Sequence, residues 1–364
     1  MVAPIKLPDP HPDAKLLSRQ LLSAIIAEIR KKKQISFARY MELALYAPQL
    51  GYYQNALHKL GEQGDFVTAP EMSPLFSYCI ANHCATVLRD MHDGDILEFG
   101  AGSGVMAADI LLALEKMNQL PQHYFILELS AALQHHQRET IQKKAPALLK
   151  RVVWLTALPA QPISGVVIAN EVLDAMPAHL FMMKNGIKEC VVVEDKHQLK
   201  LMPVENTALE TEIEKYDIDF SENYLSEINL NIQPWIKSVS QSLSKGQVLI
   251  IDYGFLRHEY YHPDRVMGTL MCHYRHHAHS DAFFYPGLQD ITAHVDFTAV
   301  GEAGEANGFS VSFSNQAEFL LHNNLLAFVR DQVGGDAFLQ NQGIIKLTSP
   351  SEMGELFKVM VLTK

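Results

Sequence analysis

The sequence feature that most restricts the fold is a glycine-rich turn, EFGAGSG at 98–104. It directly follows a short apolar run, 95–99, which we predict to be a β-strand, and it opens a predicted helix at 103–118. Glycine lets the backbone turn sharply and approach a ligand without a Cβ atom in the way, and the first turn of a helix offers unpaired N–H groups. The turn therefore predicts a loop for a nucleotide-containing cofactor. The alternative is a tight strand-to-helix connection that binds nothing.

Two features favour S-adenosylmethionine over a dinucleotide as the cofactor. A dinucleotide loop would place its third glycine at position 105, where this chain has Val105, and the turn begins with an acid, Glu98. Glu128 ends the second predicted strand, where a carboxylate can accept hydrogen bonds from both ribose hydroxyls. Glu98 either contacts the cofactor or holds the loop through backbone N–H groups. The cofactor-binding candidates of this region are Glu98, Gly100, Gly102, Gly104, Glu128 and Leu129.

From residue 95 onward, short apolar runs alternate with helical stretches, a pattern typical of βαβ units around a parallel sheet. The predicted fold class is therefore α/β, with a Rossmann-like sheet. The predicted strands are 95–99, 123–128, 151–155, 165–169, 247–252 and 309–313, with the last run, 357–363, closing the sheet edge. The predicted helices are 103–118, 130–144, 233–244, which Gly246 ends, and 316–330.

A helical N-terminal region precedes this sheet, and an antiparallel β insertion interrupts it. The helices predicted for the N-terminal region are 16–33, 37–46 and one that begins at Pro74 with Ser73 as its N-cap. Between the fourth and fifth predicted strands, Asn185-Gly186 separates two β-rich runs, which is a strong hairpin signal. A third strand follows, so residues 178–204 are predicted to form an antiparallel insertion.

The fourth predicted strand runs into Asn170, Glu171 and Asp174, which are candidate catalytic residues. Asn170 is also a candidate for cofactor binding. Ligands of open α/β sheets bind beyond the carboxyl ends of the strands, so a methyl acceptor is expected to meet the cofactor here. If this stretch forms one helical turn before Pro177, both carboxylates share a face and can bind a guanidinium group. The alternative is that the two acids only complement a helix dipole.

The charge balance narrows the class of partner. Acids outnumber bases by 41 to 30, which gives a formal net charge of −11. Such a balance argues against a nucleic-acid or anionic-membrane binder and suits a basic, arginine-bearing protein substrate better. The sequence does not decide between a monomer and a homodimer.

We expect a cytoplasmic protein. The first residues, MVAPIKLPDPHPDAK, lack the apolar stretch of a signal peptide, and Asp9 and Asp13 argue against a transit peptide. No apolar run approaches the roughly 20 residues needed to cross a bilayer. The four cysteines form no C-x-x-C pair and are expected to be reduced thiols; they are Cys79, Cys84, Cys190 and Cys272.

The stretch CHYRHHAHSD at 272–281 is rich in histidine. Metal binding through these side chains is an alternative, but the spacing does not match a tetrahedral Cys/His site, and we predict no metal. The histidines concerned are His273, His276, His277 and His279.

Seven separated motifs occur in this chain, and in their order and content it resembles the MidA-like methyltransferase family, which includes a mitochondrial complex I assembly factor that methylates an arginine. The motifs are GDFVTAPE at 64–71, EFGAGSG at 98–104, ELS at 128–130, NEVLDAMP at 170–177, DYG at 252–254, GTL at 268–270 and GLQDITAHVDF at 287–297. The resemblance covers most of the chain and implies a class I methyltransferase fold. It divides the chain into a helical region at 1–92 with a cofactor-covering loop and a core at 93–364, which carries a substrate-side insertion at 178–232 and a lid or substrate segment at 253–297.

The resemblance also implies roles for residues outside the glycine turn. Residues of a loop that closes over the cofactor would be Gly64, Asp65, Thr68 and Glu71. Residues that line the acceptor side or a lid would be Asp290, Thr292, His294 and Asp296, of which His294 and Asp296 are catalytic candidates, and Tyr253 would border the same site. The alternatives are a capped loop packed on the helix from Pro74 and a strand whose alternate polar residues face water.

The resemblance implies an S-adenosylmethionine-dependent methyltransferase that acts on an arginine of a protein. Two other functions stay open at this point. One is methylation of a small metabolite, because acceptor choice lies in loops added to a shared core. The other is an assembly factor that binds the cofactor and a partner without turnover.

Overall fold

The computed structural model describes residues 7–55, 68–91, 93–331 and 337–364. Its contacts group the chain into two compact units, which are described separately. Unit 1 comprises residues 1–66, 174–232 and 256–296, and unit 2 comprises residues 67–173, 233–255 and 297–364. The region predicted at 1–92 is thus shared between both units, and the segments predicted at 178–232 and 253–297 nearly coincide with the two later parts of unit 1.

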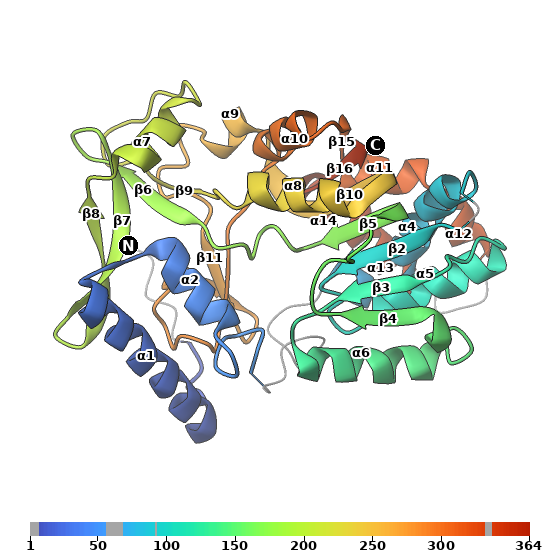
Figure 1. Cartoon of the computed structure of the whole chain (residues 1–364), viewed down its shortest axis with the longest axis horizontal. Coiled ribbons are helices and arrows are strands. Elements are labelled where there is room, and N and C mark those ends of the chain that lie inside the picture. The colour runs from blue at the N-terminus through green and yellow to red at the C-terminus, as the bar shows by residue number, and fades with distance from the viewer. Residues whose placement is uncertain (1–6, 56–67, 92, 332–336) are drawn as a thin grey trace. The chain divides into compact units, whose positions relative to one another are not determined.

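Unit 2 is built on one mixed β-sheet (Figure 1). In order across the sheet, its strands are β15 (Ser310–Asn315), β16 (Phe357–Thr363), β10 (Leu243–Phe255), β5 (Ile163–Asn170), β2 (Asp95–Phe99), β3 (Tyr124–Leu127) and β4 (Val152–Leu155). From β10 to β4, neighbouring strands run parallel. The chain goes from β2 outward to β3 and β4 and then returns to β5 on the other side of β2. The strand order therefore reverses at β2, the position where open α/β sheets bind ligands.

The parallel strands confirm the predicted α/β fold with a Rossmann-like sheet, but the prediction for the C-terminal strand is wrong. Strand β16 does not close the sheet edge: it lies between β10 and β15 and runs antiparallel to both. Its residues Val359 and Leu362 are buried, whereas β15 forms the edge and is mostly exposed or half-buried. A run as apolar as FKVMVLT is favoured inside a sheet, where both faces are covered.

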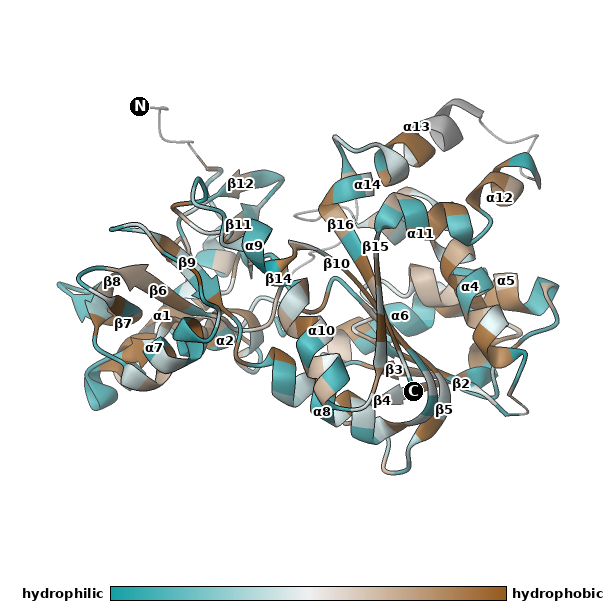
Figure 2. Ribbon diagram, turned by 90° about the horizontal axis from the view of Figure 1, so that it is seen from above, coloured by the Kyte–Doolittle hydropathy of each residue, from teal (hydrophilic) through white to brown (hydrophobic). Residues whose placement is uncertain are grey.

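Helices cover both faces of the sheet of unit 2, and Figure 2 shows α8 and α10 on one side and α4 and α5 on the other. The helices of this unit are α3 (Ala69–Met72), α4 (Pro74–Leu88), α5 (Val105–Lys116), α6 (Ala131–Lys144), the short 3-10 helix Leu149–Arg151, α8 (Ile232–Ser242), α10 (Phe297–Ala306), α11 (Gln316–His322), α12 (Leu325–Asp331), α13 (Ala337–Thr348) and α14 (Met353–Leu356). Ile96, Ile126 and Ile168 pack in one buried cluster with α4 and α5. On the opposite face, the ring of Phe99 lies 5.2 Å from that of Trp235 in α8.

Two predicted helix ends differ from the structure. The helix predicted at 316–330 is broken: α11 ends at His322, α12 begins at Leu325, and Asn324 between them has φ 67°. Gly246 does not end a helix, because α8 already ends at Ser242 and Gly246 is part of β10. The N-terminal end of α4 is as predicted, since the Ser73 side chain accepts a hydrogen bond from the N–H of Leu75.

The described residues of unit 1 form two antiparallel sheets. The first has the strand order β1 (Ile35–Ser36), β7 (Ile187–Asp195), β6 (His179–Met183) and β9 (Leu225–Ile228), with β8 (Gln198–Val204) also paired to β7. The second has the order β12 (His277–His279), β11 (Met271–Tyr274) and β13 (Asp290–Thr292). The remaining elements are β14 (Val295–Asp296), α1 (Pro12–Lys32), α2 (Phe37–Tyr46), α7 (Thr207–Glu214) and α9 (Arg257–Tyr260).

The hairpin predicted at Asn185-Gly186 is confirmed. These two residues connect β6 to β7 with φ angles of 50° and 102°, as a tight hairpin turn requires. The insertion is larger than the range 178–204 predicted from the pattern, because β9 pairs with β6 and β1 pairs with β7. Two short strands distant in sequence are not detectable from local periodicity.

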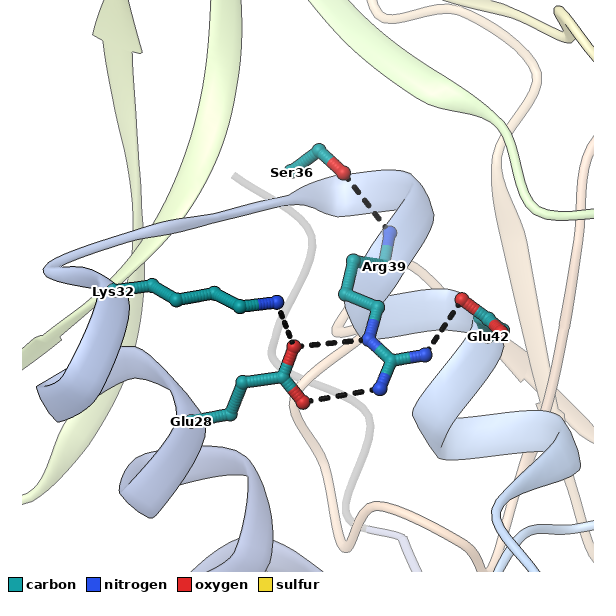
Figure 3. A network of polar contacts seen from close by, with 5 residues as sticks. All are labelled: Glu28, Lys32, Ser36, Arg39 and Glu42. Carbon is teal, nitrogen blue, oxygen red and sulfur yellow. Dashed lines mark hydrogen bonds and ion pairs between the residues drawn. The ribbon is translucent and has the colours of Figure 1, made fainter.

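Helices α1 and α2 are joined by a polar network on the surface of unit 1 (Figure 3). The guanidinium of Arg39 donates to both carboxylate oxygens of Glu28 at 3.0 and 3.1 Å, and Lys32 contacts Glu28 at 2.8 Å. Arg39 above all, and then Lys32, lower the pKa of Glu28 to about 2.

No helix formed by the described residues, α1 included, is both long and apolar enough to cross a membrane.

Two glycines permit the close packing of β2, β5 and β10. A Cβ atom at Gly165, where φ is 144°, would lie 1.9 Å from the carbonyl oxygen of Asp95, and one at Gly246, where φ is 135°, would lie 1.9 Å from that of Gly165. Backbone cannot move away in the middle of a sheet that is covered on both faces. Gly301 in α10 differs, since its Cβ would meet Met360 at an ordinary 3.5 Å.

We predict that Gly165→Ala lowers the free energy of unfolding on the order of 3–5 kcal/mol, because it adds backbone strain to an overpacked contact. The matched change Gly301→Ala is expected to stabilise the chain by up to about 1 kcal/mol through helix propensity. Urea unfolding of both variants measures the two effects. Equal stabilities for both variants would contradict the packing described for β2 and β5.

Candidate active site

The glycine turn connects β2 to α5 through three left-handed residues. Gly100, Gly102 and Gly104 have φ angles of 59°, 53° and 83°, and Gly104 is the N-cap of α5. At Gly100, a Cβ atom would meet no described atom within 4 Å, whereas at Gly104 it would lie 3.0 Å from the Cα of Gln137. The turn is therefore open at its first glycine and packed against α6 at its third.

Parallel register aligns the other candidates with this turn. Phe99 is opposite Leu127 of β3 and Ala169 of β5, so the residues that follow, Gly100, Glu128 and Asn170, leave three adjacent strands at the same edge. This edge is the carboxyl end of the sheet at the point where the strand order reverses. The structure thus brings together three of the positions that the sequence singled out.

Of the residues predicted for the covering loop, Glu71 contacts the glycine turn. The hydroxyl of Ser103 donates to the carboxylate of Glu71 in α3, and Thr68 is the N-cap of the same helix. Gly64 and Asp65 lie outside the described residues. Glu71 is thus in contact with the turn, and its role beside the cofactor stays a prediction. Ser103 was part of the motif but was not singled out as a contact.

Glu128 is a buried carboxylate, 8% exposed, and a donor contacts each of its two oxygens. The N–H of Ser130 donates to its Oε1 at 2.8 Å, and the side chain of Gln137 donates to its Oε2 at 3.1 Å. A carboxylate oxygen can accept more than one hydrogen bond, so these contacts leave the chemistry of ribose binding intact. The next residue, Leu129, is 63% exposed, although it is a large apolar side chain. An apolar side chain beside the ribose acid suits contact with an adenine ring.

Glu98 is almost completely buried, and its carboxylate does not hold the loop through backbone N–H groups in the way that one sequence interpretation supposed. Its Oε2 accepts a hydrogen bond from the hydroxyl of Tyr124 at 2.8 Å, and its Oε1 has no partner among the described residues. Burial raises the pKa of Glu98 to about 7; the Tyr124 hydrogen bond opposes that shift, and the nearby charge of Glu128 adds to it. A cation placed near Glu98 would favour its ionised form.

The turn after β5 is not helical, which corrects the prediction of a helical turn before Pro177. Residues 171–177 form bends and a turn, and Glu171 has φ 52°, a left-handed conformation that is uncommon for a residue other than glycine. Asp252, fully buried in β10, accepts hydrogen bonds from the N–H groups of Val172 and Leu173 at 3.2 and 2.9 Å. These N–H groups are therefore held by a side chain, and Glu171 and Asp174 do not share a helical face or a helix dipole.

Asn170 and Asp174 are both candidates next to this turn. Asn170 is the last residue of β5; its Nδ2 lies 3.4 Å from the carboxylate of Glu171, and its Oδ1 is buried without a partner among the described residues. Asp174 is 5% exposed and belongs to unit 1, where its carbonyl oxygen accepts the N–H of Ala293.

The acceptor-side candidates Asp290, Thr292 and Asp296 are buried, with exposures of 3%, 2% and 7%. The alternative that these residues face water from a strand is therefore wrong. Asp290 accepts a hydrogen bond from the hydroxyl of Tyr53 at 2.8 Å, and Asp296 accepts one from Nε of Arg257 at 3.0 Å. These contacts lie within unit 1, whereas the glycine turn belongs to unit 2.

His294 is half-buried in unit 1, and burial together with Arg265 lowers the pKa of its imidazole to about 4. Its backbone N–H donates to the hydroxyl of Thr269 at 3.0 Å. Thr269 in turn donates from its own N–H and hydroxyl to Glu227, a carboxylate that is 1% exposed. The GTL motif is thus part of a buried hydrogen-bond network that ends at the backbone of His294.

The histidine-rich stretch forms the hairpin of β11 and β12, with Arg275 and His276 at the turn. Its histidines are not gathered around one point: His277 is exposed on β12 and is opposite Tyr274 on β11. Over the described ranges, no group of three or more His, Cys, Asp or Glu side chains is arranged to hold a metal ion.

The four cysteines are buried and form no disulfide bond.

Sequence reasoning missed several buried polar residues that contact candidate residues or their neighbours within the same unit. They are Tyr124, Gln137 and Asp252 in unit 2 and Glu227 in unit 1. Gln137 lies in a helix whose sequence, AALQHHQRETIQKK, is polar almost throughout. Its spacing from Leu133 and Ile141, four residues to each side, was the available signal that it faces inward. Asp252 was part of the DYG motif, but nothing local indicates that its carboxylate reaches the turn after β5.

The residues present fit S-adenosylmethionine. Glu128 suits the ribose hydroxyls of this cofactor. The open side of Gly100 leaves room for the part of the cofactor that contacts the protein backbone. The buried acceptors Glu98 Oε1 and Asn170 Oδ1 suit a donor such as the ammonium group of the cofactor. Both acceptors lie at or before the ends of neighbouring strands, β2 and β5. Other buried acceptors without a partner occur elsewhere in the described chain, so the location of these two is what connects them to a cofactor.

A solved structure with the same fold contains a ligand of the expected kind. The chain is 41% identical to a protein from Burkholderia thailandensis that was crystallised with S-adenosyl-homocysteine, with a TM-score of 0.95 over 99% of this chain and 95% of the other. A native crystal structure from the same organism is 42% identical, with a TM-score of 0.92.

Several relatives are named as protein arginine methyltransferases. The chain is 27% identical to the bovine (Bos taurus) "Protein arginine methyltransferase NDUFAF7, mitochondrial", over 94% of this chain and 83% of that protein. It is 25% identical to the homologue of that protein from Drosophila melanogaster, over 100% of this chain and 89% of the other.

We predict that Gly104→Ala abolishes detectable binding of S-adenosylhomocysteine, because the new Cβ meets the α6 backbone at 3.0 Å in addition to adopting a left-handed φ. Gly308 is a matched control: its φ of 84° is nearly the same, but a Cβ there would meet no described atom within 4 Å. Gly308→Ala should cost about 1 kcal/mol of stability and leave binding unchanged. Calorimetry on both folded variants decides the matter, and normal binding by Gly104→Ala would show that the turn does not touch the ligand.

We also predict a pH dependence for the ligand-free protein from Glu98. A carboxyl group whose pKa is raised to about 7 by folding stabilises the folded state below pH 4.5 and loses that contribution as the pH rises through about 7. The stability of Glu98→Gln relative to wild type should therefore increase between pH 4.5 and 8, on the order of 3 kcal/mol. Urea unfolding at both pH values measures the change, with Glu115→Gln, an exposed acid of α5, as control. If the difference in stability between Glu98→Gln and wild type is the same at both pH values, the Glu98 carboxyl is not protonated by burial.

Fold, site and relatives lead to the same class of protein. The sheet has its order reversal at β2, the glycine turn and Glu128 lie there, and a relative of the same fold holds S-adenosyl-homocysteine. Residues 79–314 match the family model described as "Putative S-adenosyl-L-methionine-dependent methyltransferase", which spans more than half of the chain. The chain therefore belongs to this family of S-adenosylmethionine-dependent methyltransferases.

Proposed function

We propose that this methyltransferase acts on an arginine side chain of a protein substrate. The observation that carries the proposal is the match to relatives named protein arginine methyltransferases, which extends over 94–100% of the chain rather than over the cofactor core alone. A match of this extent includes the insertions of unit 1, and acceptor choice usually lies in such insertions.

Glu171 is the residue of unit 2 best suited to contact the acceptor. It follows β5 at the carboxyl edge that also carries the glycine turn, and its φ of 52° places it among the strained residues that concentrate at functional sites. Two anchors hold this conformation: the N–H of Glu171 donates to the carbonyl of Ile251, and Asp252 binds the two following N–H groups. The strain is thus supported by fixed partners on β10.

The task of such a site is mainly one of placement. S-adenosylmethionine, when bound, supplies a methyl group on a sulfonium centre, which is already a strong electrophile. The protein has to hold the acceptor nitrogen at near-attack distance and exclude water. We assign the orientation of the guanidinium group to the carboxylates of Glu171 and Asp174, because charge-assisted hydrogen bonds to two of its nitrogens concentrate lone-pair density on the third.

Composition supports a basic protein partner in a reducing compartment. The formal charge of −11 favours association with a cationic protein, and four unpaired, buried cysteines suit the cytoplasm. The relatives named above are mitochondrial by name, so the compartment is part of the proposal. The rival functions are methylation of a small molecule and binding of a partner without turnover.

We predict that Glu171→Gln and Asp174→Asn each lower methyl transfer at least about 100-fold, because each removes one charged anchor of the guanidinium group, while the affinity for S-adenosylhomocysteine stays within about threefold of wild type. Transfer is measured with labelled S-adenosylmethionine on proteins captured from the host, followed by mass spectrometry for methylarginine. Glu205→Gln, which removes an acid with an 88% exposed side chain from unit 1, is the control and should keep full transfer.

Three outcomes would contradict the proposal in different ways. Unchanged transfer by both variants would remove the two acids from the acceptor site. Label found only in small molecules would support the metabolite alternative. Absence of S-adenosylhomocysteine as a product, with folded protein and captured partners present, would support a binding function without turnover.

A further inference from the structure

Gln137 lies at the centre of a hydrogen-bond network that joins the glycine turn to the predicted ribose acid. It is fully buried, with 0% exposure, in a helix where only one other side chain, Ile141, is buried. Its Nε2 donates to the carbonyl oxygen of Gly102 and to Oε2 of Glu128, both at 3.1 Å. Its Oε1 accepts a hydrogen bond from Nε1 of Trp154 in β4 at 2.9 Å.

The partners determine which way this amide faces. The indole of Trp154 can only donate, so it requires the amide oxygen, whereas a carbonyl and a carboxylate can only accept, so they require the NH₂ group. All three contacts are satisfied in one orientation, and a flipped amide would lose each of them. A buried network in which every contact is complementary holds its members in fixed positions.

We propose that Gln137 is a positioning residue for cofactor binding: it orients the carboxylate of Glu128 toward the ribose hydroxyls and fixes the glycine turn relative to that carboxylate. The inference rests on the assignment of Glu128 to the ribose, which its own variant tests below. The N–H of Ser130 holds one oxygen of Glu128, and Gln137 holds the other. Without Gln137, the carboxylate loses the contact that holds Oε2 and its orientation is less restricted.

The packing around Gln137 explains why the same residue affects both elements. The backbone of α6 at Gln137 lies 3.0 Å from the position of a Cβ at Gly104, so the turn rests directly on this helix. The carbonyl of Gly102 is bound from the same amide that binds Glu128. One side chain therefore contacts both the turn and the predicted ribose acid.

A purely structural role makes a different prediction. If Gln137 only fills space, its replacement weakens every ligand of the site equally or lowers stability alone. If it acts through Glu128, the loss depends on the hydroxyl groups that Glu128 binds. Methionine is close to glutamine in size and removes all three hydrogen bonds, so Gln137→Met separates the two roles with little change in volume.

The experiment compares two ligands by calorimetry: S-adenosylhomocysteine and its 2′,3′-dideoxy analogue, which lacks both ribose hydroxyls. Gln137→Met should weaken S-adenosylhomocysteine at least tenfold and the dideoxy analogue less than threefold. Glu128→Ala should show the same selectivity, and the double variant should lose little beyond the larger single loss. Equal losses for both ligands, or no loss with S-adenosylhomocysteine, would overturn the positioning role.

Gln134→Met is the matched control, because Gln134 donates to the backbone carbonyl of Glu128 at 2.7 Å and not to its carboxylate. It should leave the preference for the hydroxylated ligand unchanged. If Gln137→Met does not fold, Trp154→Phe gives a second test: it removes the donor that fixes the amide and should produce a smaller loss with the same selectivity. No selectivity in Trp154→Phe would equally refute the proposal. Since only binding is measured, the result does not depend on the identity of the methyl acceptor.

Discussion

The site depends on how the chain leaves β2. Every second residue of the turn is a glycine with left-handed backbone angles: Gly100, Gly102 and Gly104. These angles let the chain reverse at the carboxyl edge and begin α5 there. Since β3, β2 and β5 are in parallel register, this reversal places Glu128 and Asn170 level with the start of the turn. A helix N-terminus, the predicted ribose-binding acid and the predicted acceptor-side strand end then meet at one edge without any long-range loop.

Sequence periodicity predicted the parallel part of the sheet because each of its strands is a short apolar run closed by turn residues on both sides. Strand β2 and helix α2 have the predicted bounds, and the hairpin between β6 and β7 follows from Asn185-Gly186. These features are local: each depends on residues within one turn or one strand of the chain. The position of β16 inside the sheet is not local, since it depends on pairing with β10, more than a hundred residues earlier.

The parts of the site that the sequence did not reveal are those made by a distant polar side chain. The segment after β5 has the composition of a helical turn, but the carboxylate of Asp252 takes the N–H groups of Val172 and Leu173, so an alternative to helical hydrogen bonding is provided from another strand. Gln137 was overlooked for a similar reason. In a helix that is polar on every side, one inward amide is visible only through its spacing from Ile141.

Hydrogen-bond partners distinguish the polar residues that hold the fold from those that face a ligand. Asp296 is buried but paired with Arg257, whose guanidinium also stacks over Tyr216 at 4.1 Å, so its charge is already balanced inside unit 1. This ion pair connects the segment 287–297 to α9. Glu98 presents the opposite case: it is as buried as Asp296, has only a tyrosine hydroxyl on one oxygen, and lies at the strand end where the cofactor turn begins. Burial, which the two acids share, therefore does not distinguish their roles. Glu98 differs because its described partners include no cation and because it lies at the order reversal of the sheet, and these two features make it the candidate for a ligand contact.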